Sequence, residues 1–175
     1  MKIIDLSGDI YTGLPVFPGD PEVSVEQIQT IENEGWNLNR IEISSHDSTH
    51  VNAPIHMKAW GKNLDDYTLK DFIGPARLYE SYEDILSDEW LIFHESDITW
   101  EIAKEIIKIK PSFIGLPTKF EFDVEIEKFL LEHDIVSFER LENTDKLPKK
   151  FFFHGAPLKL RAWDGSPVRA YAIVD

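Results

Sequence analysis

Three histidines and a carboxamide lie within eleven residues of this chain. His46, His50 and His56 are three of its six histidines, and Asn52 stands between the last two. Imidazole is the commonest protein ligand for divalent transition metals, and it is also the side chain best suited to general base catalysis near neutral pH. One short segment could therefore both bind a metal and move protons.

The context of this segment narrows its structure. A β-biased stretch over residues 38–43 precedes it, which favours a strand that runs into a loop and directs polar side chains toward one point. A helical zinc protease motif would need Glu directly after the first histidine, but Asp47 stands there, and Pro54 would break such a helix. A solvated surface loop rich in His, Ser, Thr and Asn remains the alternative.

Composition excludes several classes of protein. A chain of 175 residues fits one domain over residues 1–175, and the absence of cysteine rules out disulfides, thiolate zinc sites and cysteine nucleophiles. The 32 acidic and 18 basic side chains give a formal net charge of −14, which disfavours nucleic acid and anionic membranes as partners. Because the first residues enter a strand pattern without a signal-peptide region, we expect a cytoplasmic protein.

Short strands and two amphipathic helices are predicted along the chain. One helix follows a Thr99 cap and ends before Pro111, with Ile102, Ala103, Ile106 and Ile107 on its apolar face. The other follows an Asp123 cap and carries Ile126, Phe129, Leu130 and His133 at helical spacing. Strand patterns occur over residues 2–6, 38–44, 76–79, 90–94, 112–115, 135–138, 150–154 and 168–174. Periodicity alone supports an α/β class.

Three motifs together resemble a known family, the cyclase family of metal-dependent hydrolases that includes the kynurenine formamidases (arylformamidases). Residues 46–56 are similar to its signature H-x-G-T-H-x-D-x-P-x-H, with Ser48 in place of Gly and Asn52 in place of Asp. Residues 17–21 look like its N-terminal P-G-D loop, and residues 164–170 (Asp-Gly-Ser-Pro-Val-Arg-Ala) look like its C-terminal signature. The resemblance covers nearly the whole chain.

The resemblance implies a swivelling β/β/α fold, with a mixed sheet, a barrel-like core and few helices. It implies hydrolysis of an amide or of a cyclic amide or ester, such as N-formylkynurenine from tryptophan breakdown, by a metal-activated water. In the family the first metal is held at the positions of His46, His50 and Asn52, and His56 corresponds to the catalytic histidine. The resemblance also implies a homo-oligomer, a dimer or tetramer, with the N-terminal loop near a neighbour's pocket.

A second metal in the family is completed by a His and a Glu twelve residues apart. Glu139 matches that Glu, whereas Glu127 stands where the family has the His. Asp to Asn at 52 and His to Glu at 127 leave the formal ligand charge unchanged. Oxygen ligands favour Mn or Mg, while His46 and His50 suit Zn, so we expect Zn or Mn and one ion rather than two. A solvated helix residue is the alternative interpretation of Glu127.

Several residues have weaker assignments. Candidates for a substrate pocket are Phe17, Trp36, Thr49 and Trp60, although such aromatics are more often core residues. His94 and His133 fit packed or surface positions, while His154 could approach the site in place of the missing imidazole. We interpret Asp164 mainly as part of a structural turn. A non-catalytic metal- or ligand-binding protein with a degenerate site is the competing functional hypothesis.

Overall fold

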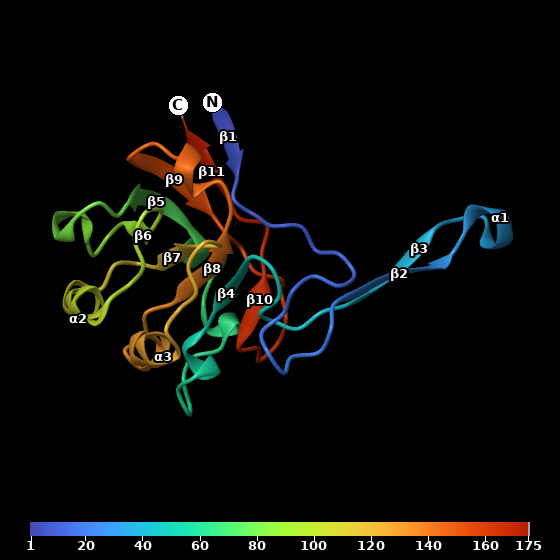
Figure 1. The fold of residues 1–175 in the computed structure, drawn as a ribbon, viewed down its shortest axis with the longest axis horizontal. Coiled ribbons are helices and arrows are strands. Elements are labelled where there is room, and N and C mark those ends of the chain that lie inside the picture. Colours follow the sequence, from blue (N-terminus) through green and yellow to red (C-terminus); the bar gives the residue numbers. More distant parts are fainter. Residues whose placement is uncertain (175) are drawn as a thin grey trace.

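A nine-stranded mixed sheet organises the computed structural model, which describes residues 1–174 (Figure 1). The strands follow the order β1-β11-β9-β5-β6-β7-β8-β4-β10 across the sheet. Their bounds are β1 Lys2–Asp5, β4 His50–Asn52, β5 Ile73–Leu78, β6 Trp90–Ile92, β7 Ile114–Pro117, β8 Ser137–Leu141, β9 Lys150–His154, β10 Gly165–Pro167 and β11 Tyr171–Val174. Strands from both ends of the chain thus pair in one sheet.

Parallel pairing is confined to the middle of the sheet, where β5, β6, β7 and β8 run side by side. Parallel neighbours need a crossover connection, and two of these connections contain α-helices. α2 (Trp100–Ile109) joins β6 to β7, and α3 (Val124–Glu132) joins β7 to β8. Both helices lie on the same side of the sheet (Figure 1).

Both helices begin at the predicted caps. The Thr99 side chain accepts a hydrogen bond from the backbone N–H of Ile102, and the Asp123 carboxylate accepts from the N–H groups of Glu125 and Ile126. In α2 the buried residues are Ile102, Ala103 and Ile106, three of the four predicted for its apolar face, and Ile107 is partly buried against the same cluster. In α3 the buried residues include Ile126 and Leu130, while His133 is exposed at the C-terminal end.

The apolar core forms on both sides of the sheet. Inside the curl of the sheet the rings of Trp90, Phe138 and Phe153 pack within 5.4 Å of one another, centroid to centroid. A second cluster between the sheet and the two helices includes Phe93, Ile106 and Leu130. The mixed α/β fold with few helices and a barrel-like core, predicted from the family resemblance, is confirmed.

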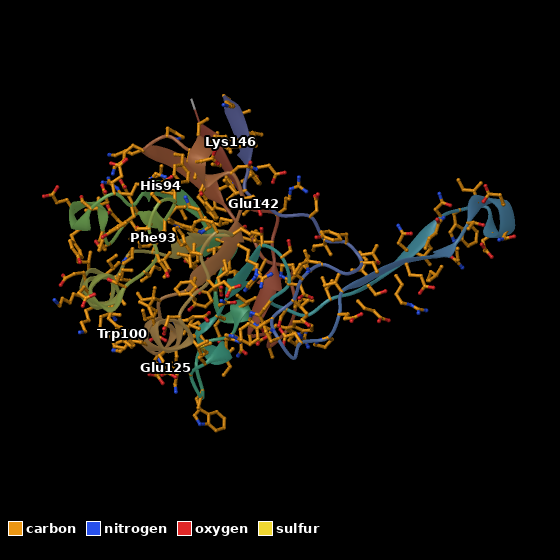
Figure 2. The ribbon with its side chains drawn as sticks, in the orientation of Figure 1. Phe93, His94, Trp100, Glu125, Glu142 and Lys146 are labelled. Carbon is orange, nitrogen blue, oxygen red and sulfur yellow. The ribbon has the colours of Figure 1, made fainter. Side chains whose placement is uncertain are left out.

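A two-stranded ribbon projects from this body and forms an arm (Figure 1). It consists of β2 (Ser24–Gln29) and β3 (Leu38–Glu42), joined across the one-turn α1 (Ile31–Glu34). Figure 2 shows side chains along both sides of the arm, without another element packed against its outer part. The predicted strand at 38–44 is therefore present at 38–42, but it pairs with β2 in the arm and does not join the main sheet.

Three strands have no clear signal in the sequence, namely β2, β4 and β10. β4 and β10 contain three residues each, and polar or turn-forming residues such as His50, Asn52 and Gly165 dominate them. The remaining short elements are the 3-10 helices η1 Pro54–His56, η2 Leu64–Asp66, η3 Leu69–Phe72, η4 Tyr82–Asp84 and η5 Thr144–Lys146. Within residues 1–174, every helix is too short or too polar to cross a membrane.

Candidate active site

The site is built on β4, between β8 and β10. His50 lies opposite Glu139 of β8, and Asn52 lies opposite Ser137 of β8 on one side and Gly165 of β10 on the other. Residues two apart on a strand, and residues directly opposite on a neighbouring strand, share one face of the sheet. The side chains of His50, Asn52 and Glu139 therefore point to the same side.

His50 is buried, and its two ring nitrogens have different partners. Nδ1 lies 2.8 Å from the backbone carbonyl oxygen of Ser48, which fixes the proton on Nδ1. Nε2 is then left with its lone pair, 3.5 Å from Oε1 of Glu139. This is the arrangement that a metal-binding histidine needs, because the second nitrogen is held by a backbone acceptor.

His46 occupies the space that the glycine on β10 leaves open. A Cβ atom added at Gly165 would lie 2.4 Å from Cε1 of His46. The His46 ring lies between two oxygens, with Nδ1 2.7 Å from Asn52 Oδ1 and Nε2 2.9 Å from Asp164 Oδ2. Burial lowers the pKa of His46, but the hydrogen bonds to Asp164 and Asn52 outweigh it, so the pKa lies above its usual value.

Asn52 connects the histidines to two acidic residues. Its Nδ2 donates to Glu127 Oε1 at 2.6 Å and to Glu139 Oε1, and these contacts orient its Oδ1 toward His46. Glu127 is only 6 % exposed, so it is not a solvated helix residue, and α3 contributes directly to the site. The structure thus brings together four parts of the chain that are distant in sequence, namely residues 46–52, Glu127, Glu139 and Asp164.

The two carboxylates are buried close to each other, and this separates their pKa values. Burial and the neighbouring charge of Glu139 raise the pKa of Glu127 to about 9. Burial also opposes ionisation of Glu139, but the nearby His50 ring and the hydrogen bonds with Glu127 and Asn52 outweigh it, so its pKa is lowered. The pair therefore retains one proton near neutral pH in the absence of a cation.

His56 and Asp164 complete the cluster. The His56 ring centroid lies 4.0 Å from that of His46, and His56 Nδ1 lies 3.2 Å from Asp164 Oδ2. Within residues 1–174, His46, His56 and Asp164 are the one group of three His, Asp or Glu side chains whose potential ligand atoms all lie within 4.8 Å of one another. Hydrogen bonds from both histidines hold the pKa of Asp164 well below its usual range. Sequence reasoning missed Asp164 as a site residue, although it opens the C-terminal signature.

Thr49 and Ser48 shape the loop around the site. The Thr49 hydroxyl donates to the carbonyl oxygen of Arg140 at 2.6 Å and accepts from the backbone N–H of Gly8 at 2.8 Å, so it joins three segments of backbone. Ser48 has φ of 55°, a left-handed conformation that favours glycine. This explains why glycine suits that position in the signature, and it means that Ser48 is strained.

The three aromatic pocket candidates lie at the surface of the single chain. Phe17 is 59 % exposed in the N-terminal loop, Trp60 is 97 % exposed in the turn after η1, and Trp36 is 58 % exposed. Trp36 lies on the arm between α1 and β3, where its ring N–H donates to Gln29. Each of these side chains is thus open to solvent within one chain, and their assignment to a substrate pocket stays a prediction.

The other three histidines do not join the cluster. His133 is exposed at the end of α3, and His94 lies 3.7 Å from Glu95, so the packed or surface interpretation holds for both. The His154 ring stacks on Tyr171 with centroids 4.7 Å apart, and its buried Nε2 has no hydrogen-bond partner. The hypothesis that His154 replaces the missing imidazole is not supported by these contacts.

This combination of residues matches the cyclase fold and its signature. The family model described as "Putative cyclase" matches residues 4–138, and the chain belongs to this family. A kynurenine formamidase of Salinibacter ruber is 29 % identical over 206 residues, covering 97 % of this chain and 96 % of the relative. A kynurenine formamidase of Paracidovorax citrulli is 28 % identical, covering 95 % and 94 %.

Solved structures support the same fold. An isatin hydrolase bound to the product analogue thioisatinate has a TM-score of 0.78 at 21 % identity, covering 99 % of this chain and 92 % of that chain. A structure described as a potential metal-dependent hydrolase with cyclase activity has a TM-score of 0.77 at 23 % identity, covering 98 % and 96 %. At this level of identity the similarity establishes the fold.

Proposed function

We propose that this chain is a metal-dependent hydrolase that cleaves an amide or a cyclic amide or ester bond. The observation that carries the proposal is the cluster on β4, where His46, His50 and the Asn52 oxygen converge beside His56. The named curated relatives are kynurenine formamidases, which supports a substrate of the aryl formamide class.

The donor set suits one divalent transition metal. His50 Nδ1 donates a hydrogen bond to the Ser48 carbonyl oxygen, which leaves the lone pair of Nε2 available to a metal. His46 Nδ1 faces the Asn52 oxygen. His46 Nδ1, His50 Nε2 and Asn52 Oδ1 would hold the ion, with Zn or Mn the best match to two imidazoles and an oxygen. A metal bound there would lower the pKa of water from about 16 toward 7 and polarise a carbonyl group.

The orientation of Asn52 favours one ion rather than two. A residue that bridges two cations must offer an acceptor to each, but Asn52 directs its Nδ2 donor toward Glu127 and Glu139. These two carboxylates are therefore occupied by the amide and by their shared proton. Glu127 and Glu139 would become ligands of a second ion only if Asn52 released them.

His56 would transfer protons during hydrolysis. It lies beside His46, and its hydrogen bond to Asp164 uses Nδ1, so its Nε2 would be the nitrogen that exchanges protons. We expect His56→Asn to lower turnover about 10²- to 10⁴-fold, the usual scale for a general acid or base, with little change in metal content. Metal loss in this variant equal to that in His46→Ala would contradict the role.

The substrate pocket would be completed in a homo-oligomer, a dimer or tetramer. Phe17, Trp36 and Trp60 are exposed in one chain, and Trp36 lies on an arm that extends from the body (Figure 1). Exposed apolar side chains on the ribbon favour association, because isolated two-stranded ribbons are marginal in water. The arm of one copy would bring aromatic residues near the site of its neighbour.

Elemental analysis together with a hydrolysis screen tests the proposal. Purified protein should contain about one Zn or Mn per chain, and His46→Ala with His50→Ala should abolish this binding. The exposed His133 offers a matched control, since His133→Ala should retain the metal. Aryl formamides and cyclic amides or esters form the substrate panel. Stoichiometric metal that survives the double replacement would contradict the proposed ligands.

The screen also separates the enzyme from a binding protein on the same fold. Metal binding without hydrolysis of any amide or ester would favour the non-catalytic alternative. Strained Ser48 and the occupied Asn52 amide are the features that would account for such a loss.

A further inference from the structure

Asp164 contacts both His46 and His56 through one carboxylate oxygen. Its Oδ2 lies 2.9 Å from His46 Nε2 and 3.2 Å from His56 Nδ1. The sequence placed Asp164 in a turn, and the structure has a bend at Asp164, directly before β10, where its carbonyl oxygen accepts from Ala53 N–H at 2.8 Å. Its side chain, however, points into the histidine cluster.

The position of the Asp164 carboxylate is fixed from several sides. The Ser45 hydroxyl donates to Oδ1 at 3.1 Å, which leaves Oδ2 for the two imidazoles. The bond to Ala53 ties the residue to the segment between Asn52 and η1, and Gly165 directly follows at the start of β10. Asp164 is thus held against the same strand that carries His50 and Asn52.

For His46, this contact determines which nitrogen is available to a metal. A carboxylate only accepts hydrogen bonds, so Nε2 must carry the proton. Nδ1 faces the Asn52 oxygen, 2.7 Å away, and donates to it in the metal-free chain, so Nδ1 is the nitrogen that would release its proton to bind a metal. Metal-binding histidines commonly donate their other N–H to a carboxylate, which fixes the ring and raises its basicity.

For His56 the same carboxylate selects the opposite tautomer. Nδ1 must carry the proton to donate to Asp164 Oδ2, so Nε2 keeps its lone pair. In water, a histidine side chain prefers the tautomer protonated on Nε2. The contact with Asp164 therefore enforces the form that a free side chain disfavours, and this form presents a base at Nε2.

We propose that Asp164 is a positioning residue that holds a proton on Nε2 of His46 and on Nδ1 of His56, which leaves His46 Nδ1 for metal binding and His56 Nε2 for proton transfer. The role rests on the proposed metal-dependent hydrolysis. In this role a single carboxylate orients both the metal-binding His46 and the proton-transferring His56.

Nitrogen-15 NMR of the imidazole rings in the metal-free protein tests the tautomers directly. Above the titration range of histidine, at about pH 8, His56 should be protonated on Nδ1 in the original chain. In Asp164→Ala it should shift mainly to the Nε2 form. Asp5→Ala is a matched control, because Asp5 pairs with Arg169 of the same C-terminal signature and not with the cluster. An unchanged His56 tautomer in Asp164→Ala would overturn the proposal.

Zinc affinity, measured with the metal alone, provides the second readout. Asp164→Ala should weaken zinc binding about 10- to 100-fold, the scale for a residue that orients a ligand, and Asp164→Glu should recover part of the loss. His56→Ala should leave the affinity nearly unchanged. Equal, complete loss in Asp164→Ala and His56→Ala would instead make both residues direct ligands and overturn the positioning role.

The two readouts separate this proposal from the proposed function. A chain that binds no zinc would contradict the metal-dependent hydrolase, whereas the ring spectra test the control of tautomers by Asp164 in the same sample. If Asp164→Ala does not fold, Asp164→Leu supplies the same comparison, because Leu is close to Asp in size and has no acceptor for the His56 N–H. A His56 spectrum that does not respond to Asp164→Leu either would overturn the proposal.

Discussion

The Asn52 amide contacts both buried carboxylates and stabilises them in the interior. Because its amide donates to Glu127 and Glu139, it stabilises a pair of acidic groups that would otherwise repel each other in the interior. The family signature has Asp at this position and a His in place of Glu127. Exchanging both residues retains the formal charge, and because the two side chains are in direct contact we predict that they act as a matched pair.

Restoring the family residues tests this pairing. Asn52→Asp alone would place a third carboxylate beside Glu127 and Glu139, and Glu127→His alone would leave Asn52 as a weak bridging ligand, so each should disturb metal binding. The double variant should bind a second metal ion. Metal affinities of all four proteins should show a coupling of about 0.5–3 kcal/mol, typical of residues in contact. Strictly additive effects would place Glu127 outside the site.

The pH dependence of stability gives a second test at Glu127. Its pKa in the folded chain is raised to about 9, so the folded state binds more protons than the unfolded state between about pH 4.5 and 9, and stability falls as pH rises through that window. Glu127→Gln removes this loss. Without metal, the variant should be about 1–3 kcal/mol more stable than the original chain at pH 8, by chemical denaturation, and the difference should shrink toward pH 5.

Glu125→Gln is the control, because Glu125 lies in the same helical turn and is exposed. It should change stability by a few tenths of a kcal/mol at most, without this pH dependence. A Glu127→Gln variant less stable than the original chain at pH 8 would indicate that Glu127 is ionised in the metal-free protein.

At the scale of elements, three short strands align the site. β4 contributes His50 and Asn52, β8 contributes Glu139, and β10 contributes a glycine that leaves room for His46. α3 adds Glu127 from the helical layer. The site therefore depends on the register of β10 against β4 as much as on its own ligands.

A single methyl group on β10 should disrupt this register or displace His46. Gly165→Ala would place Cβ 2.4 Å from His46 Cε1, so we expect a stability loss of about 1–3 kcal/mol and weaker metal binding. The double variant Gly165→Ala with His46→Ala removes the ring that collides and should recover most of the stability. If it does not, the cost arises from the backbone of β10 and not from His46.

At the scale of the whole molecule, the arm is the main feature without a partner in the single chain. Its exposed apolar residues are Ile28, Ile31, Trp36, Leu38 and Ile41. These side chains lie on a ribbon that is distant from the core, so they do not stabilise the chain by burial within it. Their exposure is the physical reason to expect association.

Replacing two arm residues tests that expectation. Trp36→Ala with Ile41→Ala should shift the protein from a dimer or tetramer toward monomer in sedimentation velocity, because the apolar contact area is reduced. Leu69→Ala, which removes a 68 % exposed side chain from the body, should leave the assembly unchanged. A monomeric original chain would rule out the oligomer and the pocket shared between copies.

The sequence by itself determined the elements and the chemistry that local patterns encode. The caps at Thr99 and Asp123, the apolar faces of both helices and the strands at 2–6, 90–94 and 150–154 could be predicted because periodicity and capping are local. The dense histidine motif and the C-terminal signature were enough to predict the cyclase family and its mixed fold.

Only the tertiary structure decided which distant residues meet. Three-residue strands such as β4 and β10 are too short for a pattern that could be predicted. The sequence predicted the strand β3 but not its partner, and within residues 1–174 β3 pairs with β2 alone, outside the main sheet. The local sequence around Asp164 indicates only a turn. Its contact with His46 depends on the pairing of β10 with β4, which lie more than a hundred residues apart in the chain. The sequence did not decide between a buried and a solvated Glu127, because helical spacing places this residue at the edge of the apolar face. Only the packing of α3 against the segment after β4 buries it.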